Sequence, residues 1–244
     1  MLAKLTFMEF KLHMREFVVP LFVLILPMGL LLGFGFQPGS GDVNASLGGQ
    51  TGAEYIAAIG AGISLAILGL SVLPTALATY REKGVLRRLA TTPVRPSLLL
   101  AAQLVLYAAA ALVTVAILVV AGNLLFGTPF PKHMPAFLGS LVLGIAALFA
   151  IGLLVAAVAP TGKAGQAIGM ILFFPSLFLG GVYIPRETMP AVLRDIGDYS
   201  PLGATLKTMR DAWTGSEPRV AQLAIMAGYA VVAGVAATKL FRWE

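Results

Sequence analysis

The residues best suited to chemistry form one basic segment, Tyr80 to Pro96, with the sequence YREKGVLRRLATTPVRP. It contains five of the 17 Lys and Arg residues and lies between apolar stretches long enough to cross a bilayer. Lys and Arg in short loops resist translocation, so we expect this segment to face the cytoplasm. Charge alone leaves two interpretations open. The segment either binds a cytosolic partner or only anchors the chain in one orientation.

The spacing within this segment predicts a short helix with two different faces. The apolar residues of Leu86–Ala90 follow an i, i+3, i+4 pattern, which leaves Arg87 and Arg88 on the opposite side. Pro93 disfavours a helical conformation at Thr92, so the helix should end near that residue. A rigid helix with one apolar and one basic face favours the interpretation as a binding site for a partner.

The chain lacks the motifs of several enzyme classes. It contains no HExxH zinc-protease motif and no GxSxG serine-hydrolase motif. It has no Cys, which excludes disulfides and thiolate metal sites. The segment Thr161–Ala164 resembles a phosphate-binding loop only at its Gly-Lys pair. We therefore expect no metal site, no cofactor and no catalytic residue in this chain, and any energy from ATP must come from a partner.

The composition indicates an all-α integral membrane protein. The chain is 58% hydrophobic and 11% charged, with a mean hydropathy of +0.90, whereas soluble domains are roughly 25% charged. No ionisable residue lies in the middle of a predicted span, which argues against ion-coupled transport. Six transmembrane helices are expected, over residues 17–36, 55–79, 98–122, 135–159, 166–184 and 220–238.

Charge also predicts the orientation of these spans. Gln37 to Ala53 contains no Lys or Arg and is assigned to the outside, whereas most basic residues fall on the side of the two termini. Residues 186–219 carry five basic and five acidic residues, so the charge of this loop favours neither side. We expect both termini to be cytoplasmic.

Two segments outside the spans are predicted to be amphipathic helices. Residues 1–16 alternate apolar and charged side chains and should lie in the membrane surface. In the 185–218 loop, Pro190 is suited to the first turn of one helix, and Ser200-Pro201 should begin a second helix that ends before Gly215. Its apolar stripe must be buried in the outer leaflet or against the bundle, unless it is an ordinary surface helix. The stripe consists of Leu202, Leu206, Met209 and Trp213.

Two motifs resemble those of the type-2 ATP-binding cassette (ABC) permeases. Arg81–Leu89 (REKGVLRRL), followed by Thr91-Thr92-Pro93, is similar to the family's cytoplasmic loop between spans two and three. Pro175–Pro185 (PSLFLGGVYIP), followed by Met189-Pro190, is similar to the signature of its fifth span. One departure is Gly180-Gly181, where Ser-Gly is common in the family. The resemblance extends over the whole chain in length, number of spans and their order.

The resemblance implies a single transmembrane domain, residues 1–244, that pairs with a second copy or a paralogue and binds two cytosolic ABC ATPase subunits, which hold ATP and Mg. Residues 1–16 would be the interface helix, and the loop helix from Glu82 to Thr92 would be the coupling helix. The residues expected to couple to the ATPase are Arg81, Glu82, Lys83, Gly84, Leu86, Arg87, Arg88 and Leu89. Those expected along the substrate path are Phe173, Phe174, Phe178 and Tyr183.

These observations predict the permease subunit of an ABC exporter, acting as a homodimer in the plasma membrane by alternating access. The uncharged path favours a hydrophobic or amphiphilic substrate, such as a drug, an antibiotic or a lipid, and hence a role in multidrug efflux or antibiotic resistance. Two alternatives are a permease for a lipid-linked glycan and a membrane receptor or assembly factor that recruits a cytosolic partner without transport. The sequence does not identify the substrate.

Overall fold

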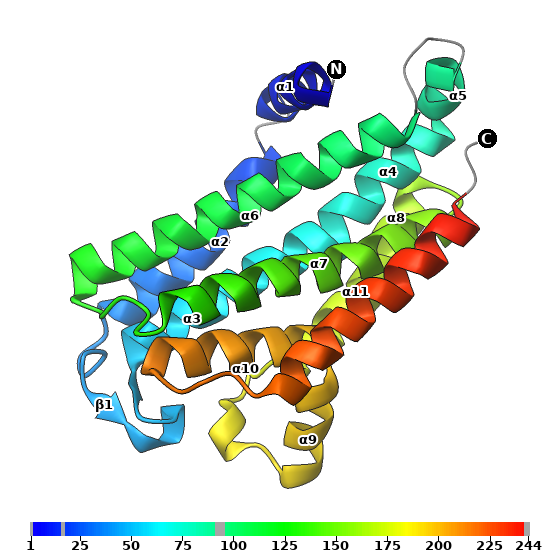
Figure 1. Ribbon diagram of the computed structural model, residues 1–244. Coiled ribbons are helices and arrows are strands. Elements are labelled where there is room, and N and C mark those ends of the chain that lie inside the picture. Colours follow the sequence, from blue (N-terminus) through cyan, green and yellow to red (C-terminus); the bar gives the residue numbers. More distant parts are fainter. Residues whose placement is uncertain (1, 16–17, 91–95, 242–244) are drawn as a thin grey trace.

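The computed structural model describes residues 2–15, 18–90 and 96–241, and these residues form a bundle of helices with one short hairpin (Figure 1). Two antiparallel strands pair Val43 with Thr51 and Asn44 with Gln50. The helices are α1 (Leu2–Arg15), α2 (Val18–Gly35), α3 (Gly52–Ala66), α4 (Leu73–Glu82), α5 (Val85–Ala90), α6 (Pro96–Phe126), α7 (Met134–Val158), α8 (Gly162–Leu179), α9 (Ala191–Tyr199), α10 (Pro201–Thr214) and α11 (Val220–Leu240). The remaining elements are β1 (Val43–Asn44), η1 (Ala45–Leu47), β2 (Gln50–Thr51), the π-helical turn η2 (Ile67–Val72) and η3 (Arg186–Thr188).

Five helical segments in the described residues are long and apolar enough to cross a bilayer, so the prediction of a multi-pass membrane protein is confirmed. They are Gly52–Glu82, Ser97–Phe126, Met134–Val158, Gly162–Leu179 and Val220–Leu240. The first expected span, residues 17–36, corresponds to α2, whose apolar part Phe22–Gly35 is shorter than these five. The number of six spans therefore stays a prediction.

The segment formed by α3, η2 and α4 is the centre of the bundle. It is continuous over 31 residues, and its most apolar stretch is 83% buried inside the protein. The π-helical turn η2 directly precedes Leu73-Pro74 at the start of α4. Proline has no N–H to donate to the carbonyl group of Leu70 four residues earlier, which explains the local departure from α-helical geometry.

Glycines let α7 and α8 approach this central segment closely. A Cβ atom at Gly152 of α7 would collide with the carbonyl oxygen of Gly69, and one at Gly169 of α8 would collide with that of Leu70. Both oxygens belong to η2, so two spans pack backbone to backbone against the same turn. Small residues at such positions permit the close contact between helices that membrane proteins use in place of a hydrophobic driving force.

The fifth expected span begins and ends earlier than predicted. Residues 166–184 were expected to be helical, whereas α8 covers Gly162–Leu179. The side chain of Thr161 accepts a hydrogen bond from the N–H of Ala164 at 3.1 Å, so the helix begins at Gly162, four residues before the expected start of the span. At the other end Gly181 has φ of +86°, a left-handed conformation that ends the helix.

Helix α10 begins and ends where the sequence predicts, whereas α9 begins at Ala191, one residue after Pro190, which was expected in its first turn. The hydroxyl of Ser200 accepts a hydrogen bond from Gly203, and Gly215 ends α10 with a φ of +96°. All four residues of the apolar stripe are no more than 2% exposed: Leu202, Leu206, Met209 and Trp213. Helix α10 packs against α7, α11 and α3, so the interpretation as an ordinary surface helix is wrong. Entry of α9 and α10 into the membrane stays a prediction.

Candidate functional site

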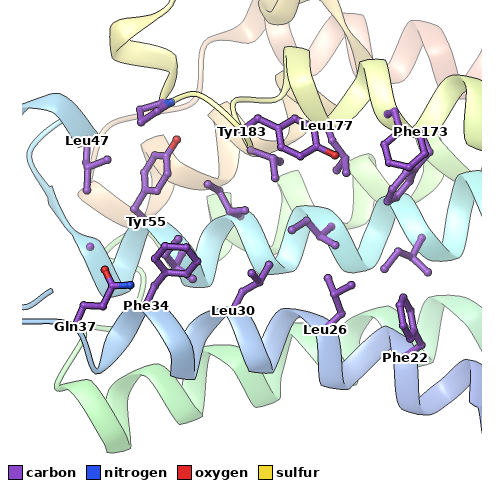
Figure 2. A pocket seen from close by; sticks show the side chains of 18 of the residues that line it. Phe22, Leu26, Leu30, Phe34, Gln37, Leu47, Tyr55, Phe173, Leu177 and Tyr183 are labelled. Carbon is purple, nitrogen blue, oxygen red and sulfur yellow. The ribbon is translucent and has the colours of Figure 1, made fainter.

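A cavity of about 1040 Å³ lies between α2, the α3–η2 segment and α8 (Figure 2). From α2, Phe22, Leu26, Leu30 and Phe34 recur every fourth residue, which places them on one helix face that points into the cavity. The other walls come from the central segment and from α8 with the loop that follows it. The residues on these walls include Tyr55, Ile56, Ile59, Ile63, Ile67, Ser71, Val72, Gln166, Met170, Phe173, Phe174, Leu177, Val182 and Tyr183.

The cavity is apolar along its length and polar toward its ends. None of the described residues that line it carries a formal charge. Gln37 and Ser40 lie beyond the end of α2, whereas Ser71 and Gln166 line the opposite end, near the start of α8. An elongated site of this kind suits a molecule with an apolar body and uncharged polar groups, because binding cavities are mostly apolar with a few orienting polar groups.

Three of the four residues expected along the substrate path line this cavity. They are Phe173, Phe174 and Tyr183, and the rings of Phe173 and Phe174 meet edge to face with centroids 5.4 Å apart. Phe178 is half-buried and is not among the lining residues. The prediction missed the whole wall formed by α2. That helix is apolar on every side, so its sequence offers no contrast that would mark the face toward the cavity.

Arg210 of α10 holds four groups near Tyr55, one of the residues that line the cavity. Its guanidinium donates hydrogen bonds to the side-chain oxygen of Gln50 at 2.8 Å, the carbonyl group of Leu47 at 3.0 Å and the carboxylate of Glu187 at 2.8 Å. It also lies over the ring of Tyr55, 4.6 Å from the ring centroid. This one side chain therefore fastens the β-hairpin, η3 and α3 to α10.

A second group of charges surrounds Asp198 at the same end. Its carboxylate pairs with Arg186 and with the ammonium of Lys207, the latter at 3.1 Å. Burial lowers the pKa of Arg186 and of Lys207, and burial raises the pKa of the nearby Asp211. Asp198 of α9 therefore joins Arg186 of η3 to Lys207 of α10.

At the opposite end of the bundle, α5 has the two faces that the sequence predicts. Val85 and Leu89 pack with a buried cluster that contains Leu99 of α6, Ala157 of α7 and Phe241 after α11. Arg87 and Arg88 are exposed on the other side, as is Lys83 just before the helix. The side chain of Leu86, and residues 91 and 92 at the end of the predicted helix, lie outside what the structure describes. A basic surface on a helix that packs against the bundle can bind an acidic groove of another protein.

Arg81 and Glu82 do not belong to this helix, in contrast to the expectation that the coupling helix begins at Glu82. Both lie in the last turn of α4, and Gly84 separates them from α5. The guanidinium of Arg81 donates hydrogen bonds to carbonyl oxygens at the end of α7, and the carboxylate of Glu82 accepts one from the N–H of Gly162 at the start of α8. Their side chains therefore bind within the bundle.

Helix α1 lies along α6 (Figure 1) and turns a polar face toward the bundle. Glu9 is 6% exposed, and its carboxylate accepts hydrogen bonds from the hydroxyl of Tyr80 at 2.9 Å and from the amide of Gln103. The ring of His13 is hydrogen-bonded to the hydroxyl of Tyr107 at 2.7 Å. Four apolar side chains of α1 are exposed, as expected for a helix lying in the membrane surface. These are Phe7, Met8, Phe10 and Leu12.

Comparisons with known proteins assign this arrangement to a family. The family model described as "ABC-2 family transporter protein" matches residues 40–239, which is most of the chain. A comparison with curated proteins gives no match. Proteins of this family are the membrane components of ABC transporters and work with ABC ATPase subunits. The chain therefore belongs to the ABC-2 family of transporter proteins, as a membrane permease.

Proposed function

We propose that this permease exports a hydrophobic or amphiphilic molecule, such as a drug, an antibiotic or a lipid, across the plasma membrane. The observation that carries the proposal is the cavity of about 1040 Å³, whose described lining is mostly apolar and free of formal charge. An ion or a strongly polar substrate would lose its hydration in such a site without gaining a partner, which costs several kcal/mol or more. An amphiphile would gain apolar contact along α2 and α8.

The arrangement of the chain also supports an exporter with separate ATPase subunits. In this proposal α2 is the first of six spans, both termini are cytoplasmic, and the exposed Arg87 and Arg88 of α5 bind the ATPase. ATP and Mg stay on two ATPase subunits, and this chain supplies no catalytic group. Closure of the ATPases then alternates the access of the cavity between the two sides.

The cavity is open on the side that a second permease would cover. Phe22 of α2 is 56% exposed and Phe174 of α8 is 55% exposed, although both line it. In the proposed homodimer, or in a dimer with a paralogue, the second copy completes the path at this seam.

A matched pair of substitutions on α8 tests the cavity. Met170 lines it, whereas its neighbour Ile171 is 70% exposed and is not among the lining residues. With the permease expressed together with its ATPase, M170W should reduce efflux of an uncharged lipophilic dye by roughly tenfold, which corresponds to about 1.4 kcal/mol. I171W should keep efflux near that of the wild type. Both variants should retain the ATPase on purification.

Measurements on a deletion strain and on the wild-type complex separate the alternative functions. Loss of surface-glycan staining in a deletion strain whose sensitivity to lipophilic antibiotics is unchanged would replace the amphiphile with a lipid-linked glycan. A wild-type complex that binds an ATPase but transports neither class would favour the receptor or assembly factor. Equal efflux by M170W and I171W would exclude this cavity as the path.

A further inference from the structure

Three consecutive side chains at the end of α4 contact three different parts of the bundle. We propose that Tyr80, Arg81 and Glu82 form a junction that transmits movement of α5 to two walls of the cavity, those formed by η2 and by α8. In this role Arg81 and Glu82 are positioning residues, distinct from the exposed arginines that bind the ATPase. The proposal rests on the proposed function, because the movement would originate in the ATPase.

Arg81 holds the end of α7. Its guanidinium donates hydrogen bonds to the carbonyl groups of Ala156, Ala157 and Ala159. The last carbonyl groups of a helix have no partner within the helix, and they carry the negative end of its dipole. A cation that contacts three of them therefore fixes α4 to α7 by both hydrogen bonding and charge.

Glu82 holds the start of α8. Its carboxylate oxygen lies 2.8 Å from the N–H of Gly162, 80 residues further along the chain. The first N–H groups of a helix lack partners and form the positive end of its dipole, which an anion stabilises. The end of α7 and the start of α8 are close in sequence, and their helix dipoles present partial charges of opposite sign. Adjacent residues of opposite charge on α4 match that order.

Tyr80 adds α1 and α6 to the same junction. Its hydroxyl donates a hydrogen bond to the buried carboxylate of Glu9 on α1 and is 3.3 Å from the amide nitrogen of Gln103 on α6. The amide of Gln103 also donates to Glu9. Four helices besides α4 are therefore held within one turn of its last residue.

The junction lies between α5 and the elements that line the cavity. Only Lys83 and Gly84 separate Glu82 from α5, and Gly84 has φ of +64°, where glycine is favoured. In the other direction α4 is continuous with η2, whose Ser71 lines the inner end of the cavity. Gln166, one turn into α8 from Gly162, lines the same end. A displacement of α5 would move η2 and α8 together only while Glu82 holds Gly162.

Substitutions of Glu82 in the complete complex test this coupling. E82A should still copurify with the ATPase and hydrolyse ATP, because α5 is unchanged, but the substrate transported per ATP should fall roughly fivefold or more, the range of energetic coupling between sites. E82Q should restore transport, since the amide oxygen can accept from Gly162. E82D keeps the charge but is one methylene too short, and it should resemble E82A.

Two controls separate transmission from docking and from general stability. The double variant R87A/R88A should lose the ATPase on purification, the opposite result to E82A. K163A removes an exposed side chain beside Gly162 and should behave as the wild type in transport and in thermal unfolding. Transport per ATP at the wild-type level in E82A, with the ATPase bound, would overturn the junction.

A second measurement needs no ATPase. The chain has no Cys, so spin labels can be placed at R87C on α5 and K163C on α8 in the purified full-length permease in lipid nanodiscs. The label-to-label distance distribution should be narrow in the wild type and in E82Q, and it should broaden in E82A and E82D. An unchanged distribution in E82A would contradict the proposed link even if E82A transported poorly. Failure of the wild type to bind any ATPase would instead contradict the proposed function and leave this distance test decisive for the junction.

Discussion

The guanidinium of Arg210 lies over the ring of Tyr55, with 4.6 Å between the guanidinium carbon and the ring centroid. Tyr55 lines the cavity, and its hydroxyl donates a hydrogen bond to the carbonyl group of Gly181 at 2.8 Å, just after α8. The pair therefore joins α10 to α3, and through α3 to the loop that follows α8.

Replacing Arg210 with Lys should destabilise the fold despite keeping the charge. Lysine lacks the planar fork that reaches Gln50, Leu47 and Glu187 together, so at least one buried group loses its partner. Leaving one buried polar group without a partner costs about 1–3 kcal/mol. Thermal unfolding in detergent would measure the loss. R194K, at an exposed position on α9, is the matched control, and equal stability of the two variants would contradict the role assigned to Arg210.

Two glycines of α7 should respond in opposite ways to alanine. At Gly152 a Cβ atom would collide with the backbone of Gly69, whereas at Gly139 it would meet nothing within 4 Å. G152A should therefore cost about 1–3 kcal/mol by overpacking, and G139A should be neutral or stabilise the protein by up to about 1 kcal/mol through helix propensity. Thermal unfolding and size-exclusion profiles of both variants would show the difference. Tolerance of G152A would mean that α7 can move away from η2 at little cost.

The stability of the protein should depend on pH through Asp211 of α10. Burial raises the pKa of this carboxyl in the folded protein above its unfolded value. A raised pKa contributes stability below the unfolded pKa, and this contribution is lost as the pH rises through the folded pKa. D211N should therefore be more stable than the wild type at neutral pH, and the difference should vanish in acid.

Thermal unfolding of D211N and wild type between about pH 4 and pH 8 would test this sign. D195N, at an exposed position on α9, provides the comparison with another carboxyl of the same region. A D211N protein less stable than the wild type at neutral pH would show that the attraction of Lys207, which acts in the opposite direction to burial, dominates.

The proposed topology can be tested directly, because the chain has no native Cys. S46C and S216C should react with a membrane-impermeant thiol reagent added outside sealed cells, whereas K163C and K239C should react only after permeabilisation. All four positions are exposed in the structure, so access across the membrane decides the labelling. Labelling of S46C and K163C from the same side would contradict the orientation.

The sequence by itself determined the class of the protein and the local features of its helices. Ser200 begins α10 and Gly215 ends it because a hydroxyl cap and a left-handed glycine act within a few residues. The two faces of α5 are similarly local, since Arg87 and Leu89 differ in position around one short helix. Hydropathy identified the apolar spans, because a run of apolar residues is itself the signal.

Only the tertiary structure decided which side chains meet across the bundle. Glu82 caps α8 from 80 residues away, and no local spacing encodes that contact. The assignment of Arg81 and Glu82 to the coupling helix followed their place in a motif, whereas their side chains turn back into the bundle. Likewise α2 is apolar on all sides, so the face that lines the cavity depends on where α3 and α8 pack. In a bilayer, lipid and protein interior are both apolar, and the amphipathic contrast that reveals a buried face in soluble proteins is absent.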